Sequence, residues 1–108
     1  RAGFVGVTVS YRLSDAPHHI HDCRRAVLWA LEHIGAYGGD VARVFISGHS
    51  AGGNIAAMLA VSDELGLQPG PAIKGVICVS GVYDIYAPTP TRTKNAIFRR
   101  IYVKPTFG

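Results

Sequence analysis

The sequence predicts an α/β domain with a doubly wound, mostly parallel sheet, in the order strand, helix, strand, helix, strand and a short final helix. Three apolar runs rich in β-branched residues predict the strands, because strands buried on both faces read in this way. They span residues 3–11, 41–47 and 73–80. The segments between them have helical spacing, and 48% hydrophobic and 17% charged residues are typical of a globular chain.

The first helix is expected from about His21 or Asp22 to Ala36, after a turn-rich connection that contains Pro17. Asp22 is placed to cap this helix or to complement its dipole. Residues 37–40, with two glycines, predict its end and a turn. An apolar stripe with the spacing i, i+3, i+4, i+7 predicts the buried face and consists of Cys23, Ala26, Val27, Ala30, Leu31 and Ile34.

The second helix is expected from Ser50 to about Leu65. Residues 55–61 are apolar almost all round, so this helix is predicted to be central and covered. Residues 66–71 break it, and the strand at 73–80 leads into a loop at 81–84. A surface loop is expected at 87–95, followed by a short helix with one apolar face, formed by Ile97, Phe98, Ile101 and Tyr102.

The formal net charge of +4 is partly local, because basic residues and no acid follow Asp84. We interpret this segment as a solvated basic face and expect no nucleic-acid partner, since no nucleic-acid motif accompanies it. The basic residues are Arg92, Lys94, Arg99, Arg100 and Lys104. Cys23 and Cys78 lie in apolar stretches outside any metal-ligand spacing, so we expect buried free thiols and no metal. No apolar run reaches membrane-spanning length.

The most specific pattern is Gly48-His49-Ser50-Ala51-Gly52, followed by Gly53, at the junction of the second predicted strand and helix. Gly-x-Ser-x-Gly in this context predicts a nucleophile elbow, a sharp turn that exposes the serine hydroxyl. Gly48 and Gly52 are expected to give room that a β-carbon would remove. The Ala51 N–H is expected to point at an oxyanion beside Ser50 Oγ. The alternative is a glycine-rich tight turn without chemistry.

Three segments in order resemble the α/β-hydrolases. They are Ser10-Tyr11-Arg12-Leu13, then Gly39-Asp40 with Arg43 to Gly53, then Ser80-Gly81-Val82-Tyr83-Asp84. The chain is most similar to the esterase group of hormone-sensitive-lipase-like carboxylesterases, kynurenine formamidase-like enzymes and bacterial feruloyl-esterase-like proteins. The resemblance covers nearly the whole chain. It implies one partial α/β-hydrolase domain over residues 1–108, truncated at both ends.

The resemblance implies that Ser50 is the nucleophile and that an acid and a histidine base follow it in the chain. The five histidines, His18, His19, His21, His33 and His49, all precede Ser50. We therefore expect the base outside residues 1–108, although a histidine from residues 18–21 is an alternative. His49 is not expected to act as base, because neighbouring elbow side chains point apart. Asp84 is a possible acid, but it is more typical of a loop-holding aspartate.

The implied function is a serine hydrolase that acts on small-molecule carboxylic esters through an acyl-enzyme, with no cofactor. Its second oxyanion donor is expected in a glycine-rich loop before Arg1. An aryl formamidase and a non-catalytic binding module of the same fold are the alternatives. Residues 1–108 alone are expected to be inactive and to expose apolar sheet edges. The sequence specifies no oligomeric state and no acyl or alcohol group.

Overall fold

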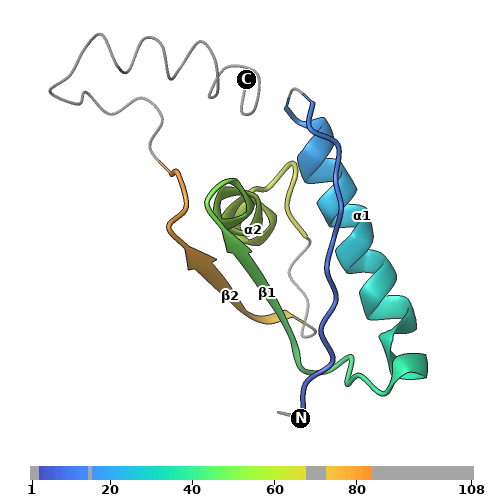
Figure 1. Ribbon diagram of the computed structural model, residues 1–108. Coiled ribbons are helices and arrows are strands. Elements are labelled where there is room, and N and C mark those ends of the chain that lie inside the picture. The colour runs from blue at the N-terminus through green and yellow to red at the C-terminus, as the bar shows by residue number, and fades with distance from the viewer. Residues whose placement is uncertain (1–2, 15, 68–72, 84–108) are drawn as a thin grey trace, which may run out of the picture.

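A computed structural model describes residues 3–14, 16–67 and 73–83 of the chain (Figure 1). Its elements are α1 (His18–His33), the 3₁₀ helix η1 (Ile34–Tyr37), β1 (Val44–His49), α2 (Ala51–Val61) and β2 (Ile73–Val79). The strands β1 and β2 pair in parallel, and α2 connects them. The predicted α/β class with a parallel sheet is therefore confirmed. The expected loop at 87–95, the final helix and the basic residues after Asp84 lie outside the described residues.

The core lies between the two helices. Four buried side chains form it: Ile20 and Cys23 from α1, and Ile55 and Leu59 from α2. Partly buried apolar side chains complete it, namely Tyr11, Val27, Met58, Leu65 and Leu67. The predicted stripe of α1 is confirmed, because each of its members is buried or half-buried. Since α2 packs against both strands and against α1, the helix that follows the serine is fixed from two sides.

The prediction of a strand at residues 3–11 is wrong. In Figure 1 this segment is a drawn-out chain that belongs to no strand, and residues 3–10 are exposed, with Phe4 at 88%. A strand needs a neighbour for its backbone N–H and C=O groups. Within the described residues, the sheet contains β1 and β2 alone. The apolar, β-branched composition of this segment is therefore not sufficient to make it a strand.

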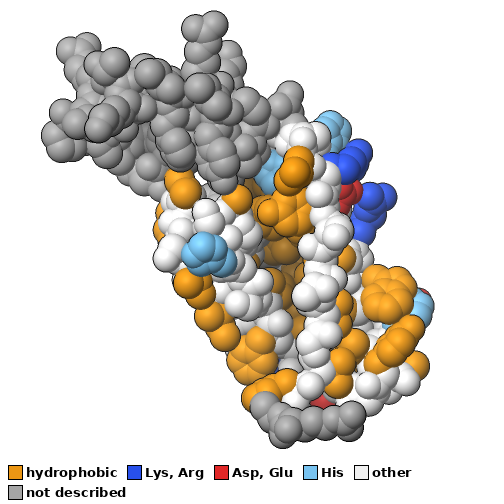
Figure 2. All heavy atoms as spheres, viewed as in Figure 1, with side chains coloured by type: hydrophobic (Ala, Val, Ile, Leu, Met, Phe, Trp, Pro, Cys, Tyr) orange, Lys and Arg blue, Asp and Glu red, His pale blue; other side chains and the backbone are white. Residues whose placement is uncertain are grey.

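The prediction that the strands are buried on both faces is also wrong for the part of the chain that the structure describes. Along β1, half-buried and exposed residues alternate, and Phe45 is 61% exposed. Among the described helices, α2 packs closely against both strands, and side chains on the opposite face of the sheet, such as Phe45, are exposed. Figure 2 shows hydrophobic side chains spread over the visible surface. For the same reason Cys78 on β2 is exposed, contrary to expectation, whereas Cys23 is buried and both thiols are free.

The structure shifts several element boundaries. The helix α1 begins at His18, three residues or more before the expected start, and Pro17 stands at its N-cap. The strand β1 begins at Val44 rather than Val41, because Asp40 holds a turn. In that turn Asp40 Oδ1 accepts a hydrogen bond from the Ala42 N–H at 2.9 Å, and Arg43 Nε donates to Oδ2 at 2.7 Å. These two contacts lower the pKa of Asp40.

The helix α2 ends at Val61, four residues before the expected end, because Ser62 adopts an extended conformation. The Ser62 hydroxyl accepts a hydrogen bond from the Leu65 N–H at 3.0 Å and starts a separate turn. The prediction that α2 is covered all round is wrong, since Ala60 and Val61 are exposed. The described helices include none that is long and apolar enough to cross a membrane.

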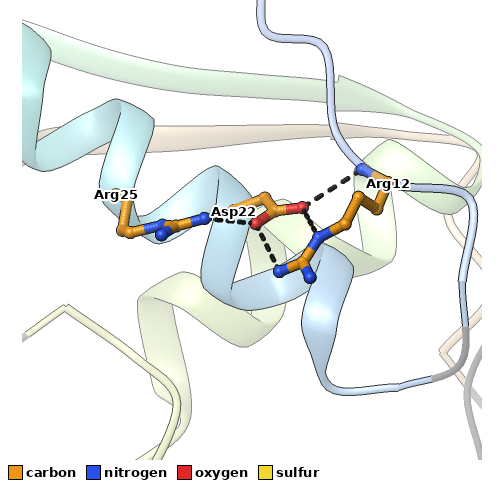
Figure 3. A network of polar contacts seen from close by, with 3 residues as sticks. All are labelled: Arg12, Asp22 and Arg25. Atoms are coloured by element: carbon orange, nitrogen blue, oxygen red, sulfur yellow. Dashed lines mark hydrogen bonds and ion pairs between the residues drawn. The ribbon is translucent and has the colours of Figure 1, made fainter.

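Asp22 does not cap α1, contrary to expectation, because it lies in the second turn of the helix. Its carboxylate instead binds Arg12, in the connection before α1 (Figure 3). Arg12 donates from its backbone N–H at 3.2 Å, from Nε at 2.7 Å and from Nη2 at 2.8 Å. Arg25 Nη2 donates at 2.7 Å from the next turn. These bonds hold the pKa of Asp22 well below its usual range and fasten residue 12 to the helix.

Replacing Asp22 by Asn is expected to lower the thermal stability of the full-length protein at neutral pH. Because the pKa of Asp22 is lowered in the folded state, its contribution is complete above the ordinary carboxyl pKa of about 4 and is lost as pH falls below it. The difference in Tm between wild type and Asp22→Asn should therefore shrink as the pH is taken from 7 to 3. Asp63→Asn, at an exposed position without an ion pair among the described residues, is the matched control. A difference that does not change with pH would contradict the prediction.

Candidate active site

Ser50 occupies the single position between the last residue of β1 and the first residue of α2. Its backbone has φ 56° and ψ −118°, which lies in a region that non-glycine residues rarely adopt. A residue held in such a conformation costs about 1–3 kcal/mol and persists only where the surroundings fix it. The local geometry is therefore the sharp strand-to-helix turn that the Gly-x-Ser-x-Gly pattern predicts.

Of the two glycines expected to give room at the turn, one does and the other does not. A Cβ on Gly48 would overlap the carbonyl group of Gly52, so glycine is required there, as predicted. A Cβ on Gly52 would meet nothing within 4 Å, so the expectation that Gly52 gives needed room is wrong. The second tight position is Gly53, where a Cβ would lie 3.0 Å from Gly81 Cα and 3.2 Å from the Val79 oxygen. The first turn of α2 thus touches both β1 and the segment after β2.

Ala51 is the first residue of α2. An N–H group in the first turn of an α-helix has no acceptor within the helix, and the helix dipole places partial positive charge there. The start of α2 thus offers an N–H group without a helical acceptor directly after Ser50. The role of Ala51 as oxyanion donor stays a prediction.

The described residues bring no histidine into a hydrogen bond with the Ser50 hydroxyl. His33 Nδ1 lies 2.9 Å from the Trp29 carbonyl oxygen at the end of α1, and its ring stacks on Trp29 at 4.8 Å. His19 is buried, with its ring 6.5 Å from that of Tyr11. His18 and His21 are exposed on α1, and His49 is exposed at the end of β1. The structure thus gives no support to a base from residues 18–21.

The possible acid expected from the sequence, Asp84, is not among the residues that the structure describes. The described part of the chain contains no group of three or more His, Cys, Asp or Glu residues that could hold a metal ion. In the segment after β2, partial loss of water around the Tyr83 phenol and its contact with the Cys78 thiol raise the pKa of Tyr83.

Sequence reasoning missed Asn54, in the first turn of α2. Its side-chain Nδ2 donates a hydrogen bond of 2.7 Å to the carbonyl oxygen of Val82, in a partly buried position. Its backbone N–H donates to the Ser50 carbonyl oxygen at 3.2 Å, and the Ser50 N–H donates to the Val79 oxygen at 2.9 Å. An asparagine directly after the glycines of the motif is a polar side chain in an apolar helix, and this contrast is the signal that could have identified it.

Comparisons with known proteins agree with this geometry. A family model described as alpha/beta hydrolase fold matches residues 1–105. Esterase LipQ of Mycobacterium tuberculosis is 38% identical over 92 residues, which cover 77% of this chain and 22% of that protein. LipM of the same organism, named a probable carboxylic ester hydrolase, is 35% identical over 104 residues, or 88% of this chain and 23% of that protein.

A kynurenine formamidase of Danio rerio is 33% identical over 86 residues, which cover 77% of this chain and 28% of that protein. The chain spans about a quarter of the length of these relatives. No solved structure shows a significant match to it.

Proposed function

Because the chain belongs to the alpha/beta hydrolase fold family, we propose that the full-length protein is a serine hydrolase of carboxylic esters with Ser50 as its nucleophile. The observation that carries this proposal is the backbone of Ser50, which is held at φ 56° between β1 and the first turn of α2. Non-glycine residues in strained conformations cluster at active sites, and Ser50 is also the central residue of the Gly-x-Ser-x-Gly motif. Relatives named esterase and carboxylic ester hydrolase support esters as the substrate class.

In the proposed mechanism, Ser50 Oγ attacks the ester carbonyl carbon while a histidine base removes its proton. The Ala51 N–H donates to the oxyanion of the tetrahedral intermediate. The protonated histidine then gives its proton to the leaving oxygen, and the alcohol is released as the acyl-enzyme forms. Water, activated by the same histidine, then attacks the acyl-enzyme and frees Ser50. Since every histidine of residues 1–108 precedes Ser50, we propose that the base, its acid partner and a second oxyanion donor belong to other parts of the full-length protein.

A formamidase is the second candidate, because one relative is named kynurenine formamidase and its reaction needs the same nucleophile and oxyanion donor. The two candidates differ in the leaving group, which is an alkoxide in one reaction and an aryl amine in the other. The non-catalytic alternative has no observation in its favour among the described residues.

The test compares kcat/KM of the full-length protein for short-chain p-nitrophenyl esters and for an N-formyl aryl amide. We expect the esters to be preferred by at least about tenfold, a difference of about 1.4 kcal/mol in transition-state binding. A preference for the formyl amide would replace the ester proposal by the formamidase. Hydrolysis of neither substrate class, together with no labelling by a fluorophosphonate, would overturn both.

A further inference from the structure

Three hydrogen bonds and a short stretch of chain close a ring beside Ser50. The Ser50 carbonyl accepts from the Asn54 N–H at 3.2 Å, and the Asn54 side chain donates to the Val82 carbonyl at 2.7 Å. Residues 79–82 lead back along the chain to Val79, whose carbonyl accepts from the Ser50 N–H at 2.9 Å. Asn54 is the residue that bonds both to the serine and to the segment after β2.

Backbone strain coincides with this ring. Within the described residues, the non-glycine residues with positive φ are Ser50, at 56°, and Ser80, at 50°. Both belong to the ring. Ser50 donates the hydrogen bond to Val79, and Ser80 follows Val79 in the chain. Gly53 and Gly81, in the two chain segments that border the ring, approach closely, because a Cβ on Gly53 would lie 3.0 Å from Gly81 Cα. Strained residues persist where their surroundings over-determine them, and a closed ring of hydrogen bonds with this close approach does so.

We propose that Asn54 is a positioning residue for the proposed ester hydrolysis. Its side chain holds Ser50 and the adjacent Ala51 N–H in the geometry that the transition state needs. The inference rests on the proposed function. The bond from Asn54 to Val82 fixes the first turn of α2 against the segment after β2. Without it, the start of the helix is held at that side by packing and by the single hydrogen bond from the Ser50 N–H to Val79. The direction of the Ala51 N–H then becomes less defined.

The deciding variant is Asn54→Asp, because a carboxylate has the same shape as the amide and cannot donate to the Val82 carbonyl. Asn54→Ala removes the donor without adding a charge, and it decides the matter if the aspartate variant has no folded state. The matched control is Arg24→Ala. Arg24 Nε also donates from a partly buried side chain to a backbone carbonyl, that of Gly66 at 3.1 Å, but beyond the far end of α2.

The first measurement is steady-state hydrolysis of a p-nitrophenyl ester by the full-length protein, at a temperature where circular dichroism shows each variant folded. We expect Asn54→Asp to lower kcat by roughly 10- to 100-fold with KM unchanged within about threefold, because misplaced transition-state contacts act in this way. Arg24→Ala should leave both parameters unchanged. A purely structural role for Asn54 would move kcat no further than the control does, and that result would overturn the proposal.

The second measurement does not depend on activity. Hydrogen exchange should show the amides of Ser50 and Asn54 exchanging at least roughly tenfold faster in Asn54→Asp than in wild type, with the amides of α1 unaffected. Arg24→Ala should not produce this local effect. Unchanged exchange at residues 50–54 would refute the positioning role even in an active enzyme. If the wild type hydrolyses no ester, the proposed function fails, and the exchange rates alone decide whether Asn54 holds the turn.

Discussion

Replacing Ser50 by Ala is expected to abolish labelling of the full-length protein by a fluorophosphonate and to lower kcat for ester hydrolysis by a factor on the order of 10⁴ or more. The reason is chemical, because alanine has no oxygen to form the acyl-enzyme. The fold should be retained, since the change removes one half-buried oxygen and leaves the backbone bonds of residue 50 in place. Gel fluorescence after probe treatment and initial rates with a p-nitrophenyl ester measure the two effects.

The matched control is Ser47→Ala, which removes an exposed hydroxyl from β1 three residues before the proposed nucleophile. This variant should be labelled like the wild type. A thermal unfolding curve for each protein shows whether a loss of labelling reflects chemistry or unfolding. Equal labelling of Ser50→Ala and wild type would show that the probe reacts elsewhere, and Ser50 would then not be the nucleophile.

The sequence predicted the parts of the structure that local interactions determine. The order of β1, α2 and β2 and the buried stripe of α1 follow from side-chain periodicity, which acts within a few turns of the chain. Ser50 could be placed between strand and helix for the same reason, since the motif, the strand and the helix are contiguous. Element boundaries were less accurate where a single side chain starts a turn, as Asp40 and Ser62 do.

The parts of the fold and of the site that the sequence did not predict depend on contacts between distant residues. Residues 3–11 have the composition of a strand, but whether they pair is decided by neighbours that periodicity cannot identify. Asp22 looked like a helix cap, whereas it binds Arg12, ten residues away. The bond from Asn54 to Val82 joins residues 28 apart. In the same way Gly53 rather than Gly52 proved to be the second tight position, because its neighbour is Gly81 in the segment after β2.

The second large effect is expected on stability. Gly48→Ala should destabilise the full-length protein by about 1–3 kcal/mol or more, because the added methyl group overlaps the backbone of Gly52 and neither side can yield cheaply. The carbonyl of Gly52 belongs to α2, which is packed on both strands, and Gly48 is paired within the sheet. Relief therefore requires that the strand and the helix move apart. Urea denaturation followed by circular dichroism measures the change.

Gly52→Ala is the matched control, four residues away in the same motif. The new methyl group meets open space, residue 52 has a negative φ, and alanine favours a helix. The free energy of unfolding of the variant should therefore be unchanged or higher by up to about 1 kcal/mol. Equal destabilisation by the two substitutions would mean that the turn resists any side chain. Opposite effects would show that glycine is needed at 48 for the close approach of strand and helix. That approach also fixes where the strained Ser50 backbone lies relative to the first N–H groups of α2.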